Sequence, residues 1–196
     1  EAHAYQADVC ARADIERLAE AVTTRQGAAH ILVNSAGVPL TKSALDVTEE
    51  DWDAVMDTGL KGMFFTCLAF GRSMVTHGYG KIINLASTYS ESVASGKSVY
   101  AIAKAGVAHL TRALALEWAP LGVRVNALAP TLTVTPTRQV VLANQERMQS
   151  ILARIPMGRY AQPSDLVGAG LFLASQASDF VTGQTLFVDG GWNAAR

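Results

Sequence analysis

The chain has 196 residues, 49% of them hydrophobic, and a formal net charge of −1. It is long enough to bury a core as a single domain over 1–196, and it lacks the strong positive charge that binding to nucleic acid or to an anionic membrane requires. The longest apolar runs are much shorter than the ~20 residues that span a bilayer, so we expect a soluble protein.

Cysteine and histidine usage favours a reducing compartment and gives no metal site. Cys10 and Cys67 are too few for the disulfide framework of a small secreted protein, and we recognise no signal peptide. The histidines share no short spacing typical of metal ligands. We therefore expect a cytoplasmic protein in which a cysteine is an ordinary core thiol.

Apolar periodicity divides the chain into alternating strands and helices. Apolar residues at helical spacing indicate helices, and short continuous apolar runs are typical of strands covered on both faces. In chain order, the pattern predicts a strand at 2–9, a helix at 14–25, a strand at 31–33, a helix at 49–76, a strand at 81–86, a helix at 99–118, a strand at 123–128, a helical segment at 138–153, a helix at 163–174 and a strand at 184–188. This alternation favours an α/β fold with a mainly parallel sheet.

The helix predicted at 49–76 has a start signal and contains interior glycines. Thr48 and Asp51 have the spacing of a capping box, with Asp in place of the usual Glu. Gly59 and Gly62 lie inside the helix, where glycine costs about 1 kcal/mol relative to alanine. We expect a bend or a close packing contact at these glycines.

Small and polar residues follow three of the predicted strands, at 34–37, at Ser87 and at 130–135. In a parallel sheet, ligands bind in the crevice beyond the carboxyl ends of the strands. We therefore expect these segments to meet at one rim of the sheet.

The helix predicted after Ser87 carries Tyr100 and Lys104, which are one helical turn apart and share a face. An ammonium close to a phenol favours the phenolate, so Tyr100 could act as a general acid or base on a carbonyl/alcohol pair. Two alternatives stay open. The pair could be ordinary surface side chains, and Ser87 could be a loop serine that bonds its own backbone.

Together these motifs resemble the short-chain dehydrogenase/reductase family of the classical type, in that family's order. The matching segments are Asp8-Val9, Asn34 to Gly37, Leu60 to Gly62, Asn84 to Ser87, Tyr100 to Lys104, Arg124 to Pro130, Thr135 and Val181 to Gly191. The resemblance implies a Rossmann-type, doubly wound sheet. It also implies an oxidoreductase that transfers a hydride between NAD or NADP and a carbonyl or secondary alcohol.

The resemblance also implies roles for individual residues. Tyr100 would exchange a proton with the substrate oxygen, Ser87 would hydrogen-bond that oxygen, and Lys104 would bind the nicotinamide ribose and favour the phenolate of Tyr100. Asp8 and Val9 would meet the adenine, and Thr135 would hold the carboxamide. The full cofactor-binding set implied by the family consists of Asp8, Val9, Asn34, Ala36, Gly37, Tyr100, Lys104, Pro130 and Thr135.

Three positions depart from the family pattern. Gly59 stands where the family has a catalytic Asn that holds a proton-relay water. Glycine has no side chain for this task, so whether the enzyme turns over without it stays an open question. Ser35 replaces the second Asn of the usual Asn-Asn-Ala-Gly, and its hydroxyl can still bond locally. Thr131 replaces a glycine, which would reshape the loop because Thr resists positive φ.

The N-terminus has no Gly-x-x-x-Gly-x-Gly motif, which the family uses to cradle the cofactor pyrophosphate. In the family, a second strand carries the residue that decides between binding NAD and binding NADP, and that strand is also not recognised in this sequence. Because strands of a sheet need hydrogen-bond partners, we expect the sequence to be a fragment of a longer polypeptide.

Other readings compete with this enzyme. A non-catalytic dinucleotide-binding relative would suit the departures at Gly59 and Thr131, and Val33 to Gly37 superficially resembles a hydrolase nucleophile elbow but lacks its first glycine. The tail favours a small hydroxylated or cyclic ketone, of sugar, polyol or 3-oxoacyl type. The long connection at 131–162 is predicted to be a substrate lid. The family also implies a homotetramer or homodimer.

Overall fold

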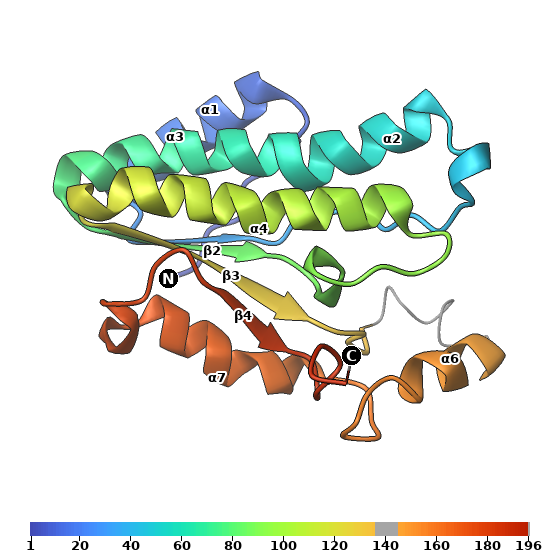
Figure 1. The fold of residues 1–196 in the computed structure, drawn as a ribbon. Coiled ribbons are helices and arrows are strands. Elements are labelled where there is room, and N and C mark those ends of the chain that lie inside the picture. The colour runs from blue at the N-terminus through green and yellow to red at the C-terminus, as the bar shows by residue number, and fades with distance from the viewer. Residues whose placement is uncertain (136–144, 196) are drawn as a thin grey trace.

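A computed structural model describes residues 1–135 and 145–195, and its helices and strands alternate along the chain (Figure 1). The helices and strands are α1 (Arg12–Gln26), β1 (Ile31–Asn34), α2 (Glu49–Met56), α3 (Gly62–His77), β2 (Gly80–Leu85), α4 (Ser98–Trp118), β3 (Val123–Pro130), α6 (Gln145–Leu152), α7 (Pro163–Ala174) and β4 (Thr185–Val188). A π-helical turn at Asp57–Lys61 joins α2 to α3.

The strands form a four-stranded sheet in the order β1-β2-β3-β4, and every neighbouring pair is parallel. Helices α1 to α4 lie on one side of this sheet and α7 lies on the other (Figure 1). Helices on both faces of a parallel sheet define a doubly wound α/β fold. The predicted fold class is therefore confirmed.

Two apolar clusters fix the helices to the sheet. On one face, Met74 of α3, Val107 of α4 and Val125 of β3 belong to one buried cluster. On the other face, Leu128 of β3 packs with Leu173 of α7. Because buried side chains at native density move little, α4 has a fixed position against the carboxyl half of the sheet.

Two expectations about the N-terminal part are wrong. Residues 2–9 form no strand, because an extended segment becomes a strand only by pairing with another, and no strand in the described part of the chain lies beside it. β1 exists, but Ile31 is 47% exposed and Val33 is 55% exposed, since β1 pairs only with β2 among the described residues. Continuous apolar composition could not distinguish an edge strand from a central one.

The helix predicted at 49–76 is present, but its π-helical turn divides it. Its capping box is confirmed: the Thr48 hydroxyl accepts from the Asp51 N–H, and the Asp51 carboxylate accepts from the Thr48 N–H. A Cβ at Gly62 would lie 2.5 Å from the Val9 carbonyl oxygen, so close packing explains this glycine. A Cβ at Gly59 would meet nothing within 4 Å.

The remaining elements agree with the predictions within a few residues. The helical segment expected at 138–153 is observed as α6, and its residues 138–144 lie outside the described part of the chain. Among the described helices, no helix combines the length and apolar composition that a membrane span needs.

Candidate active site

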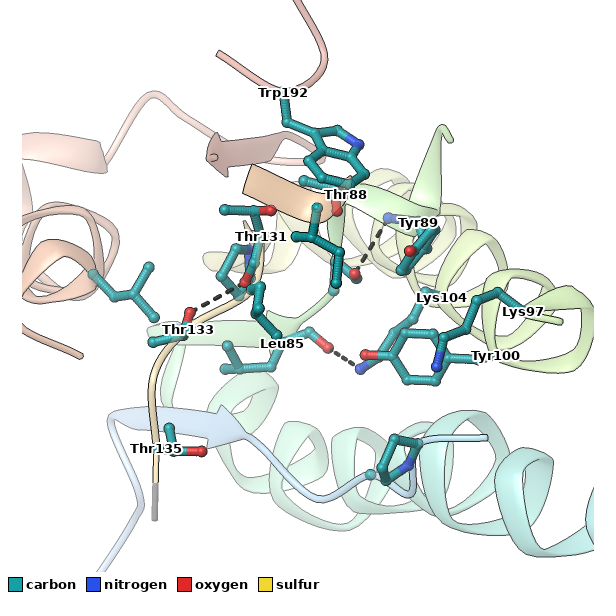
Figure 2. Close-up of a pocket in the computed structure, with 18 of the residues that line it drawn as sticks. Leu85, Thr88, Tyr89, Lys97, Tyr100, Lys104, Thr131, Thr133, Thr135 and Trp192 are labelled. Carbon is teal, nitrogen blue, oxygen red and sulfur yellow. Dashed lines mark hydrogen bonds between the residues drawn. The ribbon is translucent and has the colours of Figure 1, made fainter. Parts of the chain in front are cut away.

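A cavity of about 490 Å³ opens at the carboxyl ends of β1, β2 and β3 (Figure 2). Ser87 reaches it from the end of β2, and Tyr100 and Lys104 reach it from α4. The sequence predicted that these side chains would share one rim of the sheet, and the structure brings them together.

Lys104 is buried, with 6% of its surface exposed, so it is not an ordinary surface lysine. Its ammonium donates a hydrogen bond of 2.6 Å to the Leu85 carbonyl oxygen at the end of β2. The same Nζ lies 5.8 Å from the centroid of the Tyr100 ring. The end of β2 therefore holds a positive charge beside the phenol ring.

Ser87 satisfies the loop next to it and also lines the cavity. Its hydroxyl accepts a hydrogen bond of 3.2 Å from the Tyr89 N–H, which caps the short turn Thr88–Ser90. Ser90 in turn donates to the Lys104 carbonyl oxygen at 2.8 Å. The loop alternative is thus partly right, because this local bonding is also what fixes Ser87 against α4.

A buried polar network lies behind the cavity. The Asn34 side-chain amide donates to the Asn84 side-chain oxygen at 2.9 Å and to the Cys67 sulfur at 3.2 Å. Asn84 donates onward to the Thr111 hydroxyl at 3.0 Å. Burial raises the pKa of the Cys67 thiol to about 12. These hydrogen bonds tie β1 and β2 to α3 and α4, and they leave Asn34 out of the cavity lining.

The other predicted cofactor residues divide into two groups. Gly37, Pro130 and Thr135 line the cavity, together with Ser35. The described lining does not include Asp8, Val9, Asn34 or Ala36. Asp8 and Val9 lie before α1, where the Asp8 carboxylate accepts from the Cys10 N–H at 2.9 Å. Adenine binding by these two residues stays a prediction.

Thr131 also lines the cavity, at the position where the family has glycine. Among the described residues, only glycines have positive φ, so Thr131 adopts an unstrained backbone. Its carbonyl oxygen accepts from the Thr133 hydroxyl at 3.1 Å. The loop that follows β3 is therefore built without a left-handed residue at Thr131.

Sequence reasoning missed several cavity residues, notably Lys97, Tyr89 and Trp192. Lys97 could have been found, because it shares the helical face of Tyr100 and Lys104 at i, i+3 and i+7. Trp192 carried no such signal, because its place depends on how the C-terminal tail folds. Its ring meets the Tyr89 ring edge to face, with centroids 6.4 Å apart.

The donors around the cavity fit a nicotinamide dinucleotide. An ammonium and a phenol can bond the ribose hydroxyls, and the Thr135 hydroxyl and nearby backbone can bond a carboxamide. Lys97 and Lys104 are the charged residues in the described lining, and both are positive. Within the described residues, no group of three or more His, Cys, Asp or Glu could hold a metal ion.

The fold and this site define an NAD(P)-dependent oxidoreductase of the α/β class. A family model described as enoyl-(acyl carrier protein) reductase matches residues 1–193. The chain belongs to the short-chain dehydrogenase/reductase family, and this membership excludes the hydrolase alternative.

Individual relatives share most of the chain. A 2-dehydro-3-deoxy-D-gluconate 5-dehydrogenase of Dickeya dadantii is 42% identical over 178 residues, which are 90% of this chain and 70% of that protein. A galactitol 2-dehydrogenase (L-tagatose-forming) of Cereibacter sphaeroides is 45% identical over 164 residues, which are 83% of this chain and 65% of that protein.

A solved relative has the same fold. The crystal structure of a gluconate 5-dehydrogenase from Burkholderia cenocepacia, in complex with NADP and tartrate, superimposes with a TM-score of 0.94 at 38% identity. The match covers 96% of this chain and 74% of that one. The chain is therefore similar throughout to proteins named for the oxidation of sugar acids and polyols.

Proposed function

We propose that this enzyme transfers a hydride between NAD or NADP and a polyhydroxylated substrate of the sugar, sugar-acid or polyol type. The relatives support this class by their names, which include a gluconate, a galactitol and a threitol dehydrogenase. The observation that carries the proposal is the convergence of Ser87, Tyr100 and Lys104 on one cavity.

In the proposed mechanism, the bound nicotinamide ring supplies or accepts the hydride. Tyr100 gives its proton to the substrate oxygen during reduction and takes it back during oxidation. Ser87 hydrogen-bonds the same oxygen and fixes the reacting carbon. Lys104 stabilises the phenolate and holds the ribose, and its bond to the Leu85 carbonyl oxygen keeps it in place.

We also propose that 131–162 covers the substrate. Thr133 and Ala161 form a parallel bridge, so the two ends of this segment are joined. Ile151 and Thr133 line the cavity from it, whereas Met148 is buried and Met157 is 67% exposed. Ile151 and Leu132 are therefore the apolar residues of this segment that we assign to substrate contact. Residues 136–144 lie outside the described part of the chain.

We infer a cytoplasmic homotetramer, or a homodimer. The sequence supports the compartment through its few cysteines. The Ala-rich α4 would permit close approach of a second copy.

The test is nicotinamide absorbance with D-gluconate, galactitol and their keto products, for wild type and Tyr100→Phe. Without the phenol hydroxyl, we expect kcat/KM to fall by roughly 10²- to 10⁴-fold. Tyr79→Phe is the matched control, because Tyr79 is 38% exposed and lies outside the described lining. Equal rates for wild type and Tyr100→Phe would remove Tyr100 from the mechanism.

A further inference from the structure

Trp192 closes one end of the active-site cavity. It lines the cavity together with Tyr89, and 5% of its surface is exposed. Figure 2 shows its indole far from Thr135, and the Tyr100 hydroxyl points into the space between them. Since Thr135 is the residue assigned to the nicotinamide carboxamide, the part of a substrate that extends away from the nicotinamide runs toward Trp192.

Two ring contacts connect Trp192 to the reacting phenol. The Tyr89 ring meets the Tyr100 ring edge to face with centroids 6.0 Å apart, and it meets the Trp192 ring in the same way at 6.4 Å. Edge-to-face pairs at such distances attract each other, so each ring helps to orient the next. The three rings form an aromatic wall, and a substrate held at Tyr100 extends along this wall.

Hydrogen bonds fix the indole at the end of the aromatic wall. Its Nε1–H donates to the Ser92 hydroxyl at 3.2 Å, and that hydroxyl donates to the Thr88 carbonyl oxygen at 2.9 Å. The backbone of the same turn is held by Asp189, whose carboxylate accepts from the Gly191 and Asn193 N–H groups, each at 3.0 Å. Both the ring and the main chain that carries it are therefore held in place.

Arg154 packs on a face of the same indole. Its guanidinium carbon lies 4.0 Å from the centroid of the Trp192 ring, which is a cation–π contact. Arg154 follows α6, and its N–H donates to the carbonyl oxygen of Ile151, a lining residue, at 3.1 Å. Arg154 is therefore a positioning residue that joins the aromatic wall to the segment 131–162.

Ordinary core packing does not account for this tryptophan. In the described part of the chain, Trp192 belongs to neither apolar cluster that fixes the helices to the sheet. Its contacts are with the lining residue Tyr89, with the Ser92 hydroxyl and with Arg154, which is exposed. These contacts set the orientation of a ring at the surface of a cavity, and a fixed ring there restricts which molecules the cavity admits.

We propose that Trp192 sets the length of substrate that this enzyme accepts, and that Arg154 holds it in position. This inference rests on the proposed function, because it names which sugars, sugar acids and polyols the site admits. A longer chain would press on the fixed indole and force side chains out of their preferred rotamers. The site therefore selects six-carbon chains, the length of gluconate and galactitol, over the same chains with one more carbon.

The test compares two pairs of substrates that differ by one hydroxymethylene unit, D-gluconate with D-glucoheptonate and galactitol with perseitol. For wild type we expect kcat/KM to be about tenfold or more higher for the six-carbon member of each pair, because one carbon unit at a fixed pocket wall has an effect of that order. Trp192→Ala removes the end of the aromatic wall and should lower this ratio to about twofold or less. Trp192→Phe should give an intermediate ratio.

Substitution of Arg154 tests the positioning role and leaves the indole itself in place. Arg154→Gln removes the cation from an exposed position, so the protein should fold and the indole should become less restrained. We expect the ratio of the six-carbon and seven-carbon values to fall between those of wild type and Trp192→Ala. Arg154→Lys should bring the ratio back toward the wild-type value, because it restores a cation.

Trp52→Ala is the matched control. Trp52 lies on α2, is 39% exposed and is not part of the described lining. This variant should keep the wild-type ratio in both pairs. A purely structural role for Trp192 or Arg154 would lower kcat/KM for both chain lengths equally and leave the ratio unchanged.

The outcomes separate the two proposals. Wild type that oxidises both lengths equally, or a ratio that Trp192→Ala leaves unchanged, overturns the inference and leaves the proposed function standing; should Trp192→Ala not fold, Trp192→Phe decides in its place. A ratio that Arg154→Gln leaves unchanged overturns the role of Arg154.

Wild type that oxidises none of the four substrates argues against the proposed function. Calorimetric titration of gluconate and glucoheptonate, with NADPH present, then decides the inference without turnover. The inference requires tighter binding of gluconate by wild type and the loss of that difference in Trp192→Ala, and equal or absent binding overturns it.

Discussion

The two cysteines differ in their surroundings, and the difference predicts their reactivity. Cys67 is fully buried, and burial raises the pKa of its thiol to about 12. Only thiolates attack disulfide reagents, so Cys67 should be inert at neutral pH. Cys10 is exposed, and its sulfur lies 3.3 Å from the Thr58 hydroxyl oxygen.

We therefore expect an aromatic disulfide reagent at pH 8 to label one thiol per chain in the native protein and two after unfolding. Raising the pH toward 9 should leave Cys67 unlabelled, because its thiol has a pKa of about 12. Cys10→Ser is the control and should abolish native labelling. Rapid labelling of native Cys10→Ser would show that the buried network opens.

Asn34 shows how one side chain can serve the site from outside it. The family resemblance suggested a cofactor contact, but its amide is committed to Asn84 and Cys67. Removing one partner of a buried hydrogen bond leaves the other unsatisfied, which costs about 1–3 kcal/mol. The residue therefore holds the end of β1 in place, and its neighbours Ser35 and Gly37 face the cavity.

At the scale of elements, Gly59 and Gly62 of the long helical stretch from α2 to α3 have opposite surroundings. Gly62 lies against the Val9 and Asp57 carbonyl oxygens, where a Cβ would come within 2.5 Å and 2.9 Å. Gly59 lies in the π-helical turn with nothing within 4 Å of a Cβ. Neither has positive φ, so only packing and chain entropy distinguish them.

The pair makes a controlled stability experiment. Gly59→Ala should raise the free energy of unfolding by about 0.5–1 kcal/mol, because alanine loses less conformational freedom in a helix. Gly62→Ala should lower it by about 1–3 kcal/mol, because the backbone of Val9 must move. Urea titration followed by circular dichroism measures both, and destabilisation of equal size in the two variants would contradict the argument.

At the scale of the whole molecule, much of the fold and part of the site could be predicted from the sequence. Apolar periodicity indicated the helices and the strands β1 to β4, because it reflects burial within one element. The meeting of Ser87 with Tyr100 followed from the parallel sheet, whose strand ends share one rim.

The sequence-based predictions that were wrong or missing concern contacts between segments that are far apart in the chain. Composition could not show that residues 2–9 lack a pairing partner in the described chain or that β1 has an exposed face. The place of Trp192 in the cavity required the fold of the C-terminal tail. Local patterns contain no information on such packing.

A buried charge on β2 joins the sheet to the end of α7, which gives the last prediction. Lys81 of β2 is 1% exposed. Its ammonium donates to the Ser175 carbonyl oxygen at 2.8 Å and to the Ser178 hydroxyl at 2.9 Å, and it pairs with the Asp179 carboxylate at 2.7 Å. A cation here also complements the carboxyl end of the α7 dipole.

Lys81→Met keeps the apolar stem and removes these bonds, which leaves the end of α7 without its buried donor. We expect the free energy of unfolding to fall by about 2 kcal/mol. Lys61→Met is the control, because the exposed Lys61 pairs with Asp57 at 3.1 Å on a helix surface and should cost about 0.5 kcal/mol or less. Urea unfolding with equal losses for both variants would show that Lys81 does not hold α7 to the sheet.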